Sequence, residues 1–431
     1  MPKSLPELLL ALACTAGLSL PAVADDLLQV YEQARAGDPV LAAAAATRGA
    51  AREGAVAARG ALLPQWSLQA QYKQAQNGPE ARSRELSSRV SQVLLDLARL
   101  AQWRSAEARS EGQAALLQAA RQDLVLRVAS AYFGVLGATD QLATVQANED
   151  AFARQVRQAE SRFDAGLGAQ VDIEQARTYH ALARANTAAA RRSLLGAREA
   201  LAEITGAMPG TLKPLGEALP AEPPAPADRQ AWVETALRDN PALRAERLAL
   251  AASEQSLAGA RAAHLPTLSL GLDSGRLTQW PQATAAGNGR TDTTLGLNLT
   301  VPLFAGGATE AQRRQAAHQR DGARETLEQR RRQVARETLE QFDAVVTGLA
   351  QIEATRAAVA ASAKALAATQ TGQELGTRSM TDLLLAIQNQ AAAQSAYSQA
   401  RHQYVLARLQ LQQAAGHADD EQLAAINALL R

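Results

Sequence analysis

Cysteine and aromatic residues are scarce in this chain. Its 431 residues include a single cysteine, Cys14, and aromatic side chains account for only 3% of them. Because a disulfide framework needs paired cysteines, the sequence excludes a fold stapled by disulfides. Alanine is abundant instead, which favours helices that pack closely through small side chains over one thick globular core.

Net charge, long apolar runs and catalytic motifs are also missing. Lysine and arginine number 44 against 43 aspartates and glutamates, so the formal charge of +1 predicts no general attraction to nucleic acid. No stretch after residue 24 approaches the roughly 18 consecutive apolar residues of a transmembrane helix. Without a phosphate-binding glycine loop or a nucleophile elbow, the sequence predicts neither an enzyme nor a cofactor.

The histidines and arginines do not form a recognisable site either. The five histidines lack metal-ligand spacing, which predicts surface residues and no metal site: His180, His264, His318, His402 and His417. The arginine-rich segment from Arg313 to Arg336 is interleaved with glutamates, which predicts a solvated helix face with ion pairs along it.

The first 24 residues have the pattern of a secretory signal peptide. Lys3 precedes an apolar run from Leu8 to Leu20, and Ala22-Val23-Ala24 forms a small-x-small cleavage site. We therefore expect residues 1–24 to direct export and to be removed. A second interpretation stays open, in which Cys14 becomes the lipidated N-terminus of a lipoprotein.

The remaining sequence contains one pattern twice. Leu63-Pro64 recurs as Leu265-Pro266, 202 residues later (266 − 64), and Gly166 recurs as Gly376, 210 residues later (376 − 166). Several pairs share these two offsets, which indicates a tandem duplication with a short insertion. The predicted parts are a first repeat at 25–208, a Pro-rich linker at 209–227 and a second repeat at 228–431. We expect the linker to run extended across the outside of the protein.

Each repeat begins with a helix that proline interrupts, at Asp38-Pro39 and at Asn240-Pro241, because the residue before proline leaves helical geometry. Apolar and polar residues then alternate, most clearly at 295–301. The alternation predicts a β-hairpin at about 66–96 and another at about 267–302, with glycine-bearing tips at 77–79 and 287–289.

These hairpins have the pattern of transmembrane strands. Segments of about ten residues with one apolar and one polar face are typical of membrane β-barrels, although a single segment also fits a half-buried strand of a soluble sheet. Four such segments behind a secretory signal favour the membrane. The smallest membrane barrels have about eight strands, and an open edge in lipid leaves backbone groups unpaired, so the chain must oligomerise to close a barrel.

Long helices follow each hairpin. A helix of roughly 60 residues from Trp103 to Phe163 would be about 90 Å long. Its apolar residues step alternately by three and four between Val125 and Leu142, and the same steps recur between Phe342 and Val359, which predicts coiled-coil packing. Glycine-bearing turns then reverse the chain into further helices at 171–204 and 382–415.

In these features the chain resembles the TolC family of outer-membrane factors. The likeness is carried by Leu28-Gln29-Val30-Tyr31-Glu32-Gln33-Ala34-Arg35 before Asp38-Pro39, by Leu62-Leu63-Pro64-Gln65, by His264-Leu265-Pro266-Thr267-Leu268 and by Val301-Pro302-Leu303-Phe304-Ala305-Gly306-Gly307. The resemblance implies a mostly α fold with a membrane β-barrel. Four transmembrane strands per protomer would close a 12-stranded barrel as a trimer, continuous with a long periplasmic α-helical barrel.

The family likeness also implies a function and partners. It implies a passive exit duct in the outer membrane that spans into the periplasm, with a periplasmic adaptor protein and an inner-membrane ABC or proton-driven transporter as partners. The cargo stays open between type I protein secretion and drug efflux. The competing hypothesis from the residues themselves is a soluble periplasmic coiled-coil adaptor or scaffold.

The resemblance further implies a periplasmic gate at the two helix turns. Asp172 and Arg378 take the positions of a closing ion pair, and Asp382 that of an acidic ring at the constriction. Two gate positions are altered, since Gln373 replaces a tyrosine and Leu385 replaces an acidic residue, which implies a looser latch and a less acidic constriction. The alternative is that both aspartates only cap helix starts and that Arg378 is solvated.

Overall fold

The computed structural model describes residues 24–74, 82–217, 219–220, 222–280 and 289–431. The predicted signal peptide and nearly all of both predicted hairpin tips lie outside these ranges. The chain divides into two compact units. We call them the helical unit (24–38, 122–232 and 339–431) and the sheet unit (39–121 and 233–338), and each takes segments from both halves of the sequence.

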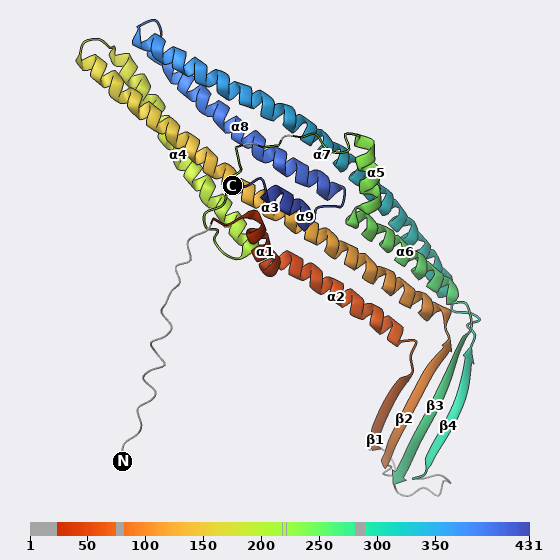
Figure 1. Cartoon of the computed structure of the whole chain (residues 1–431). Coiled ribbons are helices and arrows are strands. Elements are labelled where there is room, and N and C mark those ends of the chain that lie inside the picture. Colours follow the sequence, from red (N-terminus) through yellow and green to blue (C-terminus); the bar gives the residue numbers. More distant parts are fainter. Residues whose placement is uncertain (1–23, 75–81, 218, 221, 281–288) are drawn as a thin grey trace, which may run out of the picture. The chain divides into compact units, whose positions relative to one another are not determined.

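The sheet unit is built around one antiparallel sheet. Its strands, in the order β1-β2-β3-β4, are β1 (Gln65–Gln74), β2 (Arg82–Leu95), β3 (Thr267–Trp280) and β4 (Thr291–Thr300) (Figure 1). Helix α2 (Pro39–Gly60) leads into β1, and α6 (Pro241–Ala262) leads into β3. Because β2 pairs with β3, the two predicted hairpins join into a single sheet with β1 and β4 as its open edges.

Strand register separates the side chains of the sheet into two faces. Trp66, Val90, Leu272 and Leu295 stand in one cross-strand row, and Ser67, Arg89, Asp273 and Thr294 form the next. Successive side chains of a strand point to opposite faces. We call the face of the first row the apolar face and that of the second the polar face. The alternation predicted from the sequence is thus confirmed on β1, on β4 and in the first half of β3. Strand β2 follows it poorly, because Arg84 and Ser88 share the apolar face with Val90.

The helical unit contains most of the remaining helices. Its own helices are α1 (Leu27–Gly37), α4 (Gln170–Thr205), α8 (Met380–Ala414) and α9 (Asp420–Asn427). Helices α3 (Leu97–Asp164), α5 (Arg229–Asp239) and α7 (Ala308–Glu374) run through both units. The predicted seam is buried in α3, where Val125, Val128 and Tyr132 are at most 1% exposed. The two long helices are confirmed and slightly longer than predicted.

Both predicted proline interruptions separate two helices. In the first, Asp38 ends α1, and its buried carboxylate accepts hydrogen bonds from Arg127 at 2.8 and 3.1 Å. In the second, the Oδ1 atom of Asn240 caps α6 by accepting from the backbone N–H groups of Ala242 and Leu243, at 3.0 and 3.1 Å. Asn240 therefore satisfies backbone groups that the broken helix leaves free, whereas Asp38 is paired with an arginine of α3.

The predicted exposed linker is partly wrong. Leu212 and Leu215 are buried, and the backbone around them pairs with Asp25 and with the last residues of the chain. The hydroxyl of Tyr132 donates to the Lys213 carbonyl at 2.9 Å. Two buried leucines, each beside a backbone pairing, are therefore enough to anchor this proline-rich segment.

The surface assignment of the histidines is wrong for His402. This side chain is 7% exposed on α8 and lies against the ring of Phe133, and burial lowers its pKa. None of the helices in the part of the chain that the structure describes combines the length and apolar character needed for a bilayer span.

Candidate functional site

The predicted gate residues lie at two helix turns of the helical unit. The first turn joins α3 to α4 and the second joins α7 to α8, and both are found at the same end of that unit (Figure 1). Each turn contains a glycine with positive φ, Gly166 at 72° and Gly376 at 75°. Left-handed backbone is costly for a residue with a Cβ, which explains glycine at both positions.

An apolar cluster holds the helices beneath the two turns. Its buried side chains come from α3, α4 and α8, namely Phe152, Ala159, Ile173, Ala183, Met380, Leu383, Leu384 and Ile387. One polar contact joins the starts of α4 and α8, because Thr381 Oγ1 donates to Gln175 Oε1 at 2.7 Å. The first turns of these two helices are therefore fixed next to each other within one chain.

Arg378 lies flat against the second turn. The Gly372 carbonyl accepts hydrogen bonds from the backbone N–H groups of Thr377 and Arg378, at 2.8 and 3.1 Å, and from the Thr377 hydroxyl at 3.0 Å. A Cβ atom on Gly372 would come within 2.7 Å of the Arg378 Cγ atom. The bare Cα of Gly372 thus makes room for the aliphatic stem of Arg378.

Arg378 itself is exposed, and Asp172 is partly exposed in the first turn of α4. Within the described part of one chain, no ion pair joins them. The predicted link would therefore have to form between protomers, and it stays a prediction. Asp172 makes no side-chain cap either, since the N-cap of α4 is Ala169 and carries no capping hydrogen bond.

Asp382 has a structural role that Asp172 lacks. Its carboxylate accepts a hydrogen bond from the Ser379 N–H at 3.0 Å, and its own N–H donates to Ser379 Oγ at 3.1 Å, which completes a capping box. The backbone hydrogen bond, the Ser379 hydroxyl and the nearby Arg378 charge together lower the pKa of Asp382. The carboxylate is thus held ionised at the start of α8, whether or not it also lines a constriction.

The two altered gate positions differ in exposure. Gln373 is buried at 6% exposure in the last turn of α7, whereas Leu385 on α8 is 43% exposed. Sequence reasoning did not single out Gly372 or the Thr381–Gln175 contact. The only signal for Gly372 was its place six residues before Arg378, a spacing that acquires meaning once the turn is known.

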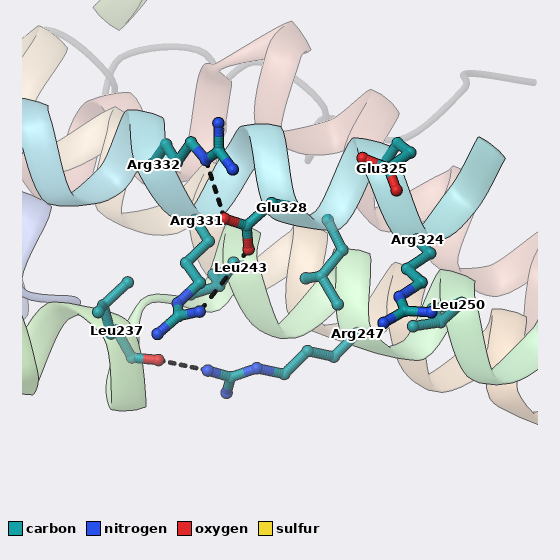
Figure 2. Close-up of a pocket in the computed structure, with 10 residues that line it drawn as sticks. Leu237, Leu243, Arg247, Leu250, Arg324, Glu325, Glu328, Arg331 and Arg332 are labelled. Carbon is teal, nitrogen blue, oxygen red and sulfur yellow. Dashed lines mark hydrogen bonds and ion pairs between the residues drawn. The ribbon is translucent and has the colours of Figure 1, made fainter. Parts of the chain in front are cut away.

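A hollow in the sheet unit lies between α6 and α7. It is lined by Arg247 from α6 and by Arg324, Arg331 and Arg332 from α7, together with glutamates and leucines (Figure 2). Glu328 accepts from Arg332 at 2.8 Å and forms an ion pair with Arg331 at 3.6 Å. The predicted solvated face with ion pairs along α7 is therefore confirmed here. In the described ranges, no group of three acidic, histidine or cysteine side chains could hold a metal ion.

The chain belongs to the outer membrane efflux protein family, whose model matches residues 30–207 and 232–417. The outer membrane protein TolC of Vibrio cholerae serotype O1 is 33% identical over 436 residues, which cover 100% of this chain and 99% of that protein. The alkaline protease secretion protein AprF of Pseudomonas aeruginosa is 29% identical, over 93% of this chain and 86% of that protein.

A solved structure shares the fold. The outer-membrane channel OprN has a TM-score of 0.79 at 23% identity, with 91% of this chain and 90% of that chain covered. The predicted family, the mostly helical fold with a membrane β-part and the outer-membrane location are confirmed. The chain is therefore an exit duct of the outer membrane, and the soluble adaptor hypothesis is not favoured.

Proposed function

We propose that three copies of this chain close one barrel in the outer membrane and one tunnel in the periplasm. The observation that carries this proposal is the exposed apolar face of the sheet. Trp66, Leu68 and Leu295 are 78%, 69% and 70% exposed in the single chain. Burying that face in lipid and pairing the edges β1 and β4 with neighbouring copies would satisfy both the apolar side chains and the free backbone groups.

Hydrogen bonding of the apolar face supports the same proposal. Three hydroxyl-bearing side chains of this face, Ser88, Ser274 and Thr293, pair with each other or with a neighbouring indole. Trp66 Nε1 donates to Ser88 Oγ at 2.8 Å, and the hydroxyls of Ser274 and Thr293 lie 3.1 Å apart. An unpaired hydroxyl is costly in hydrocarbon, so a lipid-facing surface needs such pairs.

The test of the trimer is fractionation followed by gel electrophoresis. Membranes from cells that express the chain should hold it in the outer-membrane fraction. Unheated samples should migrate as a species about three times the mass of heated ones. Recovery of the mature chain as a detergent-free monomer from the periplasm would reject the proposal.

We further infer that the two turns form a gate at the periplasmic end of the duct. Arg378 of one protomer and Asp172 of another would form the closing link, and Asp382 would contribute negative charge to the passage. Asp172 supports this role because its carboxylate makes no cap within its own chain. An exposed ion pair is worth at most about 1 kcal/mol, so such a latch can be displaced by a partner protein.

Single-channel conductance tests the latch. Arg378→Gln and Asp172→Asn should each raise the conductance in planar bilayers, by up to about fivefold for one lost link of about 1 kcal/mol. The exposed residue Arg184, on α4 beyond the turns, supplies the control variant Arg184→Gln. Unchanged conductance in both gate variants would remove Asp172 and Arg378 from the latch.

The passive duct would need an adaptor protein and an inner-membrane transporter to move cargo. AprF is named as a protease secretion protein, and another relative, BepC, is named as an outer membrane efflux protein. We therefore propose two classes of cargo, secreted proteins and small toxic compounds. Deleting the gene and scoring both a secreted protein and resistance to toxic compounds would separate the two. If the deletion left both protein secretion and resistance unchanged, that result would contradict an export function.

A further inference from the structure

The loop end of the sheet carries an uneven distribution of charge. On the described strands, every charged side chain of the apolar face is an arginine: Arg82, Arg84 and Arg276. All acidic side chains of the strands, Glu85, Asp273 and Asp292, stand in rows of the polar face. Over the described strands, the apolar face is thus positive at one end and holds no acidic residue.

These arginines occupy neighbouring rows near the strand ends that are far from the helices. Arg84 pairs with Tyr72 and Thr278, and Arg276 pairs with Leu86 in the row next to it. Diagonal neighbours in a sheet lie roughly 7–8 Å apart, so two guanidinium groups can converge on one anion. The aromatic side chains of Tyr72 and Trp280 stand on the same face at this end, exposed by 60% and 46%.

The depth of the arginines fits the outer edge of the hydrocarbon layer. Leu268 begins the apolar face next to the helices, and Arg276 follows eight residues later (276 − 268). At about 3.4 Å per residue and a strand tilt of about 40°, Arg276 lies about 21 Å from Leu268 along the barrel axis. The row of Arg84 lies about 26 Å from Leu268 along the same axis. The apolar band of such barrels is about 25 Å tall, so both guanidinium groups would reach the phosphate layer of the outer leaflet.

We propose that Arg84 and Arg276 form a binding site for the phosphorylated headgroup of an outer-leaflet glycolipid, of the bisphosphoryl lipid A type. The proposal rests on the trimeric outer-membrane duct described above, which would carry three such sites. Arginine suits this ligand because its planar guanidinium forms paired, charge-assisted hydrogen bonds with phosphate. Tyr72 and Trp280 would flank the sugar and the upper acyl chains at the same depth.

The test compares binding of bisphosphoryl lipid A to the purified trimer with that of the same lipid stripped of phosphate. The apparent Kd of the wild type should be at least about tenfold lower for the phosphorylated form. The double variant Arg84→Gln/Arg276→Gln should lose that difference. Lys73→Gln is the matched control, because Lys73 is at the same end of the sheet on the polar face, and its affinity should stay within about twofold of the wild type.

Three outcomes would overturn the site. They are equal binding of both lipids, an equal loss in Lys73→Gln, and competition by inorganic phosphate at low millimolar concentration, which would indicate a general anion site. Every variant is first checked for the heat-modifiable trimer. A wild type that is an outer-membrane trimer without phosphate-dependent binding refutes the site alone, whereas a wild type that is no outer-membrane trimer refutes the duct.

Discussion

The two helix turns share a backbone but differ in the side chains they present. Position 162 corresponds to 372, and 168 to 378, at the same offset of 210 (372 − 162; 378 − 168). The first turn has Arg162 and Gly168, and the second has Gly372 and Arg378. In both turns the two positions touch, because a Cβ on Gly168 would lie 3.3 Å from the Arg162 Cβ atom. Each turn thus accommodates one arginine at this contact. The first turn has it before the positive-φ glycine, and the second turn has it after that glycine.

The turns also differ in how the next helix begins. Ser379 caps α8 and pairs with Asp382, whereas the equivalent Ala169 leaves α4 without a side-chain cap. A side-chain cap explains the aspartate of the second copy but not the one of the first. The comparison therefore makes Asp172 and Arg378 the stronger gate candidates and gives Asp382 a structural role as well.

The largest effect on conductance is expected from Gly372→Ala. The new methyl group would displace the Arg378 stem, so conductance should rise as in Arg378→Gln, by up to about fivefold. Adding Arg378→Gln to Gly372→Ala should produce no further increase, since both act through the same guanidinium. Gly196→Ala on α4 is the control, because a Cβ there meets no atom within 4 Å.

A swap sharpens this prediction. Gly372→Arg/Arg378→Gly recreates the arrangement of the first turn. The trimer should form normally, and its conductance should exceed that of the wild type, as in Arg378→Gln. Wild-type conductance in the swapped protein would show that the side of the turn on which arginine stands does not matter.

Equal losses of stability are expected at the two positive-φ glycines. Gly166→Ala and Gly376→Ala should each destabilise the protein by about 1–2 kcal/mol, because alanine is strained in left-handed backbone. Chemical unfolding of the detergent-solubilised trimers measures this. A difference of more than about 1 kcal/mol between the two variants would contradict a shared backbone.

The capping difference predicts opposite changes in the two copies. Ser379→Ala should cost about 1 kcal/mol by removing the cap of α8. Ala169→Ser should stabilise α4 by up to a similar amount, since its N-cap backbone is already extended. Thermal dissociation of the trimer compares both variants with the wild type, and a loss of stability in Ala169→Ser would show that the first turn cannot accept a cap.

The smallest effect concerns pH. The pKa of Asp382 is lowered from its ordinary value of 3.8, so its ionised form is favoured in the folded state. The resulting stabilisation is present above the ordinary pKa and is lost as the pH falls through the lowered value. The stability difference between the wild type and Asp382→Asn should therefore shrink below about pH 4 and stay constant between about pH 5 and 7. A difference that does not shrink at all between pH 5 and pH 3 would contradict the charged cap.

Much of the architecture could be read from periodicity alone. The steps of three and four predicted the long helices, and the alternation at 295–301 predicted a strand with an apolar face. The linker and His402 could not be predicted in this way. Leu212 and Leu215 are two apolar residues in a proline-rich stretch, and a single histidine on a helix does not reveal which neighbour covers it.

Amino-acid order therefore settled the element types, the helix breaks at Pro39 and Pro241 and the positive-φ glycines, because each depends on the local backbone or on a short repeat. Only the folded chain decided that β2 pairs with β3, that Thr381 meets Gln175 and that Arg378 rests on Gly372. The Thr381 and β2–β3 contacts join residues about two hundred positions apart, and the Gly372 contact depends on how the turn closes. Such contacts arise from packing in three dimensions, which no local pattern encodes.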